Sequence, residues 1–183
     1  MIRFVFNERK TAQAAAYLLS LHKGTLNYMV LIKLLYLADR ESLVGTGTPI
    51  TGDKMVSMPR GPVLSIVLDL INMGKKDPRD WYDYISEPEN YKVSLQKESP
   101  ENDELSKFEI GILDDINQKF GHLDQWQLQE YTHTLPEWED PKGSSYPILP
   151  ETLLQVSSIP SNEIKRISEQ AEELWFLDSI KSG

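Results

Sequence analysis

The sequence predicts a mainly α-helical domain that carries a small β-hairpin. Apolar residues recur at helical spacing over most of the chain, and capping residues stand where these stretches begin. Alternating apolar and polar residues are confined to short segments bounded by Gly and Pro. The length of 183 residues fits one domain, which we expect over residues 1–160. Residues 161–183 are expected to add an amphipathic helix that packs on the same domain.

Two helices are predicted in the first quarter of the chain. Asn7 is a favourable N-cap and Gly24 a favourable C-terminal residue, so the first helix is expected over about residues 8–23. The second helix is expected from Asn27 to Gly45. Its apolar positions nearly encircle the helix, which is typical of a helix buried at the centre of a domain.

The hydrophobic period changes after this second helix. Gly and Pro surround a short alternating stretch, which predicts a turn and a short strand before residue 61. Pro62 is then expected in the first turn of a helix that ends at Gly74. Further on, DWYDYI and YKVSLQ flank SEPEN, and both are rich in aromatic or β-branched residues. This pattern predicts a small hairpin.

Capping signals define two helices in the second half. Ser106 and Glu109 have the spacing of a capping box, ahead of a helix that Gly121 closes. Asp124 is expected to cap the next helix, which Pro136 ends.

The rest of the chain is predicted to be a connector followed by helices. Residues 136–150 are expected to be irregular and are long for a loop in a compact domain. A short helix follows, and a final one starts at about residue 162. Trp126 and Trp175 lie on helical apolar stripes and are expected in the core, whereas Trp138, on the connector, is expected to be exposed.

The composition restricts the possible classes of function. There is no cysteine, which excludes disulfides, thiolate nucleophiles and cysteine-based zinc sites. The start of the chain holds too few apolar residues for a signal peptide, and no run approaches the roughly 18 apolar residues that cross a bilayer. We therefore expect a cytoplasmic protein that does not enter a membrane.

The charge is acidic and unevenly distributed. The formal net charge of −9 argues against a general nucleic-acid-binding protein. Residues 1–60 contribute +4 and the remainder −13. Such a distribution can steer a basic partner toward the acidic part, and it is equally typical of a surface that only maintains solubility.

Motifs for catalysis are weak. The glycines between residues 45 and 61 lack the spacing of a Walker loop, and no G-x-S-x-G motif is present. A metal site would depend on His22, His122 and His133, yet no H-x-x-x-H pair places two imidazoles on one helical face. His133 is more typical of a residue that orders a turn. We therefore predict that the protein is not an enzyme and holds neither a cofactor nor a metal.

The stretch from Lys33 to Ser65 is the most informative part of the sequence. Lys33, Asp39 and Arg60, together with a Thr-Gly-Asp turn, could lock this segment internally by charge-assisted hydrogen bonds. A rigid irregular segment is also what a protein-docking face requires, because little entropy is then lost on binding. The residues alone do not separate these two uses.

Four stretches of the chain carry a family resemblance: KLLYLADRESL, TPITGDKMVSMPRGPVLS, DELSKFEIGILDDINQKFG and QWQLQEYTHTLPEWEDP. They resemble the SocA-like Panacea antitoxin family, which also includes the phage-associated protein GepA. The resemblance covers about residues 10–157, and its most specific part is K-L-x-Y-x-A-D followed by P-I-T-G-D and G-P-V-x-S. One departure is MPRGPV, where the family favours an aromatic residue or lysine beside the glycine.

The resemblance implies a small, mainly helical antitoxin domain without catalysis. Members of the family neutralise toxins of several unrelated types by direct binding, and at least one acts as an adaptor that delivers its toxin to a bacterial protease. We therefore expect the chain to belong to a bacterial or phage toxin–antitoxin pair, with a basic cognate toxin as its partner.

The family pattern also suggests roles for individual residues. Gly52 is expected to form a turn with positive φ. Asp39, Asp53 and Arg60 are expected either to lock the loop or to touch the toxin. In full, we assign partner binding to Lys33, Tyr36, Asp39, Arg40, Asp53, Arg60 and Trp138, and structural roles to Thr51, Gly52, Met58, Gly61, Pro62, Val63, Ser65, Trp126 and His133.

Two other functions stay open. A metal-dependent hydrolase would use His122, His133 and nearby acids. A phage-derived binding module would have a target other than a toxin, or would bind promoter DNA through the basic first third of the chain and regulate its own operon.

Overall fold

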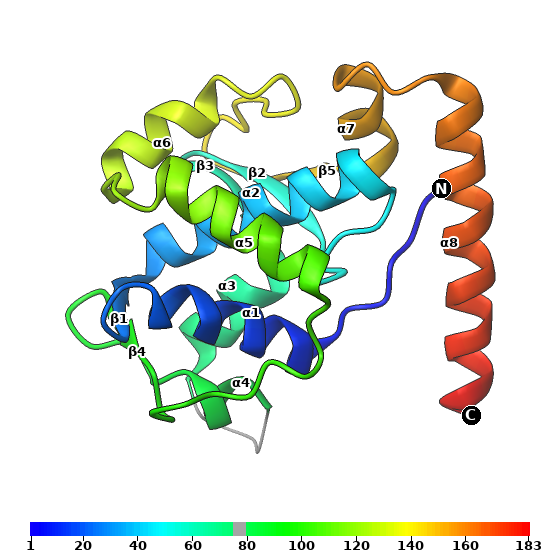
Figure 1. The fold of residues 1–183 in the computed structure, drawn as a ribbon. Helices are drawn as coiled ribbons and strands as arrows, with labels where there is room; N and C mark the ends of the chain where they lie inside the picture. Colours follow the sequence, from blue (N-terminus) through cyan, green and yellow to red (C-terminus); the bar gives the residue numbers. More distant parts are fainter. Residues whose placement is uncertain (75–79) are drawn as a thin grey trace.

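The structure of the chain, a computed structural model, describes residues 1–74 and 80–183 and is mainly α-helical with two small antiparallel sheets (Figure 1). This confirms the predicted fold class. The described elements are α1 (Glu8–Ser20), β1 (Thr25–Asn27), α2 (Tyr28–Thr46), β2 (Met55–Met58), β3 (Gly61–Leu64), α3 (Ser65–Met73), α4 (Asp80–Tyr84), β4 (Lys92–Ser94), α5 (Lys107–Phe120), α6 (Gln125–His133), β5 (Tyr146–Ile148), α7 (Pro150–Val156) and α8 (Ser161–Lys181).

Helix α2 is the central element of the fold. It contacts α1, α5, α6, α7 and β3, and most of its residues are buried (Figure 1). The side chain of Asn27 accepts a hydrogen bond from the backbone N–H of Met29, and Gly47 ends the helix with a φ of 81°. The predicted buried helix is thus confirmed, with its end displaced by one residue. The first helix, α1, has the predicted N-cap Asn7 but ends earlier than expected, at Ser20.

The larger sheet has the strand order β3-β2-β5 and differs from the prediction in two places. Pro62 lies in β3, so the prediction that it starts a helix is wrong, and α3 begins at Ser65 instead. Because β3 is an edge strand, it tolerates a residue without a backbone N–H. The segment 136–150 is not irregular throughout, since it ends in β5, whose Ile148 pairs with Met55.

The predicted hairpin around SEPEN is only partly present. DWYDYI forms mostly the short helix α4, which packs on α1 and buries the side chains of Trp81, Tyr82 and Tyr84. The strand β4 pairs with β1 rather than with this segment. Two isolated bridges remain of the predicted hairpin: Ile85 pairs with Leu95 between the flanks, and Glu89 pairs with Lys92 at the turn. Burial of these three aromatic side chains outweighed their preference for strands.

The capping predictions in the second half are confirmed. Ser106 and Glu109 form a capping box at the start of α5, and Gly121 follows the end of this helix. Asp124 accepts hydrogen bonds from the backbone N–H groups of Trp126 and Gln127 at the start of α6. These signals depend on residues close in sequence, so they can be predicted without tertiary information.

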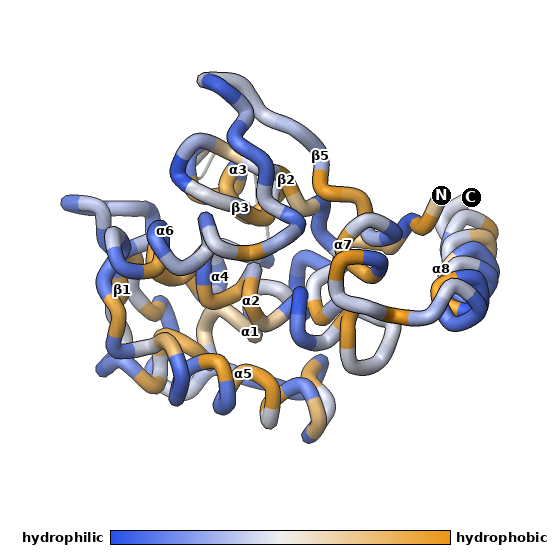
Figure 2. Tube along the Cα trace, turned by 90° about the horizontal axis from the view of Figure 1, so that it is seen from above, coloured by the Kyte–Doolittle hydropathy of each residue, from blue (hydrophilic) through white to orange (hydrophobic). Residues whose placement is uncertain are grey.

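Helix α8 lies along one side of the domain, far from β1 and α6 in both views (Figures 1 and 2). Its buried residues are Ile167 and Ala171, and Ile167 lies against Gly47 at the end of α2. In its C-terminal half Leu174, Trp175, Phe176, Leu177 and Ile180 are exposed, and the hydrophobic colouring of part of this helix is visible in Figure 2.

Candidate functional site

The Thr-Gly-Asp turn is held to α2 by a buried carboxylate. Asp39 is fully buried and accepts hydrogen bonds from the backbone N–H of Thr51, at 2.9 Å, and from its hydroxyl group. The same hydroxyl oxygen accepts a hydrogen bond from the backbone N–H of Asp53 at 3.0 Å. Burial raises the pKa of Asp39 to about 7, although the hydrogen bonds from Thr51 oppose this shift.

Asp53 continues this network by capping α3. Its carboxylate accepts hydrogen bonds from the backbone N–H groups of Ile66 and Val67, both at 2.9 Å. Residue Leu64, at the N-cap position of α3, cannot supply such an acceptor, so an aspartate from before the hairpin performs this role. Burial raises the pKa of Asp53, and the backbone hydrogen bonds oppose the shift. The network therefore fixes both ends of the β2–β3 hairpin.

Two glycines in this region are required by the close approach of neighbouring atoms, from the backbone at Gly52 and from side chains at Gly61. Gly52 has a φ of 72°, as predicted, and a Cβ at this position would overlap the carbonyl oxygen of Val5. Gly61 has a φ of 95°, and its Cβ would lie 2.6 Å from the Thr132 hydroxyl oxygen and 2.8 Å from Lys33 Nζ. Both positions thus allow neighbouring segments to pack against the turn and the hairpin.

Lys33 reaches from α2 to the hairpin. Its side chain is buried, and Nζ donates a hydrogen bond of 2.7 Å to the carbonyl oxygen of Pro62. Burial lowers the pKa of Lys33 to about 7, because the charged form loses hydration and no carboxylate lies close enough to form an ion pair with it among the described residues. A neutral amine can still donate this hydrogen bond.

A buried ion pair joins α2 to the segment after α6. Arg40 Nε lies 2.6 Å from Glu137 Oε1, and a second guanidinium nitrogen lies 3.2 Å from Oε2. The Tyr36 hydroxyl group also donates to Glu137 Oε1, at 2.9 Å. Burial raises the pKa of Tyr36 well above its ordinary value, and the charge of Glu137 adds to the shift. Bidentate geometry and the additional donor satisfy a carboxylate that is buried.

The tip of the β2–β3 hairpin is held by two rings. His133 Nε2 donates to the carbonyl oxygen of Pro59 at 3.1 Å, since a carbonyl can only accept. Trp138 Nε1 donates to the carbonyl oxygen of Met58 at 3.0 Å. The two rings stack with centroids 4.0 Å apart. With Lys33 on Pro62, side chains from three segments satisfy backbone carbonyls around the tip.

Most of the predicted site residues lie close together in the structure, but they differ in how exposed their side chains are. The side chains of Lys33, Tyr36, Asp39 and Thr51 are buried, and those of Asp53, Ser57 and Val63 also lie in the interior. Met58 and Ser65 contribute through the backbone, since Ser65 N–H donates to the carbonyl oxygen of Lys54. Arg60 is different, because it is exposed at the tip of the hairpin.

The expectations for the tryptophans are corrected. Trp126 is 57% exposed and Trp175 is 43% exposed, so neither is a core residue. Trp138, expected to be exposed, is half-buried by its stacking on His133 and its hydrogen bond to Met58. Glu137 is a site residue that the sequence does not single out, because its partners on α2, Tyr36 and Arg40, are about a hundred positions away in the sequence.

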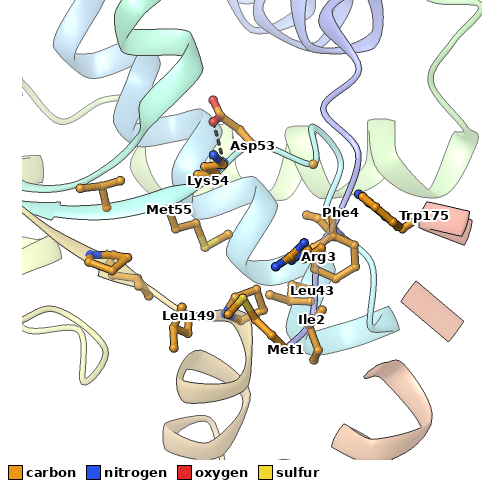
Figure 3. Close-up of a pocket in the computed structure, with 16 residues that line it drawn as sticks. Met1, Ile2, Arg3, Phe4, Leu43, Asp53, Lys54, Met55, Leu149 and Trp175 are labelled. Carbon is orange, nitrogen blue, oxygen red and sulfur yellow. Dashed lines mark hydrogen bonds between the residues drawn. The ribbon is translucent and has the colours of Figure 1, made fainter. Parts of the chain in front are cut away.

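An apolar hollow lies between the N-terminal segment, α2, β2 and residues 147–150, and Trp175 of α8 borders it. It has a volume of about 530 Å³, and Phe4, Leu43, Met55, Leu149 and Trp175 line it (Figure 3). Asp53 lies at its edge, where the carboxylate faces the backbone of Lys54.

The described residues contain no group of three or more His, Asp or Glu side chains that could hold a metal ion. His133 is committed to the hairpin tip, and His122 lies between α5 and α6. No helix in residues 1–74 or 80–183 is long and apolar enough to span a membrane.

The fold and its hydrogen-bond network define a helical domain in which residues 47–64, a turn followed by the β2–β3 hairpin, are fixed from both sides. Residues 31–139, more than half of the chain, match the family model described as antitoxin SocA-like, Panacea domain. The chain belongs to this family. The matched region includes most of α2, the hairpin, α6 and Glu137, and it ends before β5, α7 and α8. Comparisons with curated proteins and with solved structures give no match.

Proposed function

We propose that this chain is an antitoxin that neutralises a partner toxin by direct protein–protein binding. Membership of the SocA-like antitoxin family supports an antitoxin role. The main observation behind the proposal is that the buried polar side chains in residues 33–65 form hydrogen bonds within the domain. The Asp39 and Asp53 carboxylates accept hydrogen bonds within the fold, and Lys33 donates one. These groups stabilise a shape and leave the exposed residues around it for contact.

The buried residues of the predicted partner-binding set then act indirectly. Lys33, Tyr36 and Asp39 have almost no exposed surface, so they influence toxin binding by holding the hairpin and turn in place. Arg40 and Trp138 are partly buried and serve the same purpose through Glu137 and Met58. Arg60 is the member of the set that a toxin can contact directly. A preformed face loses little entropy on binding, which favours affinity.

The net charge of −9 favours a basic toxin. Long-range attraction raises the association rate of oppositely charged proteins and is screened by salt. We therefore expect the association rate to fall as ionic strength rises, with a smaller change in the dissociation rate.

Co-expression tests this function. The reading frame beside the gene for this chain is expressed alone and together with the chain, and growth is measured. We expect the neighbouring product to stop growth alone, to permit growth when the chain is present, and to co-purify with it. A harmless neighbour, or a toxic one that never binds the chain, would remove the proposal.

A protease-adaptor mechanism is the finer alternative within this function, and toxin lifetime separates the two. If the chain delivers its toxin to a protease, the half-life of the toxin falls when the chain is present. If the chain only blocks the toxin, growth recovers while the half-life is unchanged or longer. Pulse-chase labelling of the toxin, with and without the chain, makes this distinction.

A further inference from the structure

A groove beside the hairpin tip has the composition of a protein-docking site. Arg60 lines it together with Tyr28, Tyr91 and Trp126, and its volume is about 530 Å³. The Tyr91 side chain is 71% exposed and that of Trp126 is 57% exposed. Arg, Tyr and Trp are the residues that dominate binding energy at protein interfaces. The elements β1 and α6, which carry some of its lining residues, lie at the opposite end of the domain from α8 (Figures 1 and 2).

The backbone beside this groove forms a tight hairpin turn. Glu89 and Lys92 exchange both backbone hydrogen bonds, and the two residues between them, Asn90 and Tyr91, have positive φ of 50° and 64°, as a two-residue hairpin turn requires. Asparagine suits such a turn, whereas a bulky tyrosine is unusual in it. Here the turn places an exposed ring about 6.3 Å, centroid to centroid, from that of Tyr28. Folding alone gains little from a tyrosine ring that stays in water.

The groove is a local exception to the acidic charge of the protein. Arg60 is the one charged side chain among its lining residues, and the other polar ones are amides such as Asn90 and Gln129. The structure gives the Arg60 side chain no hydrogen bond or ion pair with any described residue. An arginine without an internal partner, framed by aromatic rings and amides, is suited to bind a carboxylate.

The backbone around the groove does not provide a second anion site. At the start of α2, the N–H groups of Tyr28 and Met29 donate to Tyr91 and Asn27. At the start of α6, the N–H group of Trp126 donates to Asp124. Capture of a chain terminus uses free backbone N–H groups, and the N–H groups of Tyr28, Met29 and Trp126 already have acceptors. A side-chain carboxylate, which needs only the Arg60 guanidinium, therefore suits this site better than a chain terminus.

We propose that this groove binds an Asp or Glu side chain of the toxin, carried on an extended segment whose apolar neighbours cover Tyr91 and Trp126. The proposal rests on the proposed function and names the surface and the contact that serve it. A basic toxin still carries acidic side chains, so long-range steering and this local contact are compatible. A second copy of the chain is the less suitable occupant, because two molecules of charge −9 repel each other.

Calorimetry with the purified toxin tests this assignment. The toxin is the growth-arresting product of the neighbouring reading frame. Arg60→Glu is expected to weaken binding about 30-fold or more, Arg60→Lys less, and Trp126→Ala about 30-fold. Lys181→Glu makes the same change of charge on α8, and Trp175→Ala removes an exposed tryptophan there. Both controls are expected to stay within about 3-fold of the original affinity.

A second variant separates binding from folding. Tyr91→Asn keeps a residue that tolerates positive φ and removes the ring, so the melting temperature should stay unchanged or rise while toxin affinity falls about 10-fold. Unchanged affinity in the Arg60, Tyr91 and Trp126 variants, with the original chain still binding, would overturn the groove assignment alone. Equal losses in the α8 controls would do the same. So would light scattering that shows a dimer dissociated by Arg60→Glu. If the original chain does not bind the toxin, the proposed function fails as well.

Discussion

Residues 33–65 and the C-terminal half of α8 distribute polar and apolar groups in opposite ways. The first region buries a lysine, two aspartates and a threonine, each with a hydrogen-bond partner. The second exposes five large apolar side chains between residues 174 and 180. Buried polar groups are costly unless they are paired, so the first region has one arrangement that satisfies them all. The paired polar side chains buried in residues 33–65 therefore determine the shape of this segment, whereas the apolar side chains at the end of α8 do not fix its packing.

The largest expected effect follows from Gly52→Ala. A methyl group here would overlap the carbonyl oxygen of Val5, and alanine would also be forced to a φ of 72°. We expect a loss of about 4 kcal/mol in the free energy of unfolding. Urea denaturation measures it.

Gly111→Ala is the matched control for this substitution. Gly111 lies within α5, and nothing lies within 4 Å of the position of its Cβ. Alanine is the better helix former, so a gain of about 0.5–1 kcal/mol is expected. If both substitutions changed the free energy of unfolding equally, the packing of the turn around Gly52 would not be what makes this position intolerant of alanine.

Glu137→Ala is expected to have the next largest effect. It leaves the Arg40 guanidinium and the Tyr36 hydroxyl without their buried acceptor. The expected loss is about 3 kcal/mol. Glu163→Ala, which removes the partner of Arg166 in an exposed pair on α8, is expected to cost less than about 0.5 kcal/mol. A comparable loss at both sites would show that burial of the ion pair is not what matters.

The pH dependence of stability tests the buried charges. Asp39 has a pKa of about 7 when folded and 3.8 when unfolded, so the folded state binds more protons and stability falls as pH rises between these values. Lys33 has a pKa of about 7 when folded and 10.5 when unfolded, so stability rises as pH increases above 7. Each slope is expected to be about 1 kcal/mol per pH unit.

Two substitutions assign these slopes. Asp39→Asn should remove the decline on the acid side, and Lys33→Met the rise on the alkaline side. Denaturant midpoints measured from pH 4.5 to pH 9 provide the comparison. Slopes that persist in both variants would show that other groups cause them.

The smallest expected effect is at the C-terminal end of α8. Phe176→Ser and Leu177→Ser replace side chains that are 60% and 53% exposed. Each is expected to change the free energy of unfolding by less than about 0.5 kcal/mol. Ile167→Ser, on the buried face of the same helix, should cost several times more, because Ile167 is buried against Gly47. A large loss at Phe176 would mean that this half of the helix is packed in solution.

Features determined by neighbouring residues could be predicted from the sequence, and features determined by distant pairing could not. The capping boxes at Ser106 and Asp124 are local, and so is the uninterrupted apolar pattern of α2. The position of Pro62 in a strand could not be predicted from the sequence. A strand tolerates proline when it lies at the edge of a sheet, and β3 is an edge strand because it pairs with β2 on one side only. The partners of Glu137 are remote in sequence, and neither composition nor spacing connects them.

The candidate site was predicted in outline but not in its exposure. The importance of residues 33–65 followed from their resemblance to a family, whereas the burial of Asp39 and the exposure of Arg60 required the structure. Trp126 was expected in the core because it follows a helical stripe. It stands in the first turn of α6, where no other element covers it sufficiently to bury it.

Amide hydrogen exchange, followed by NMR in the free chain and in the toxin complex, tests the central claim most directly. The N–H groups of Thr51, Ile66 and Val67 donate to Asp39 and Asp53. If the hairpin and turn are preformed, these protons exchange in the free chain only through global unfolding, and binding adds protection around Tyr91 and Trp126 instead. Rapid exchange of these three protons in the free chain, with protection gained only on toxin binding, would contradict the account.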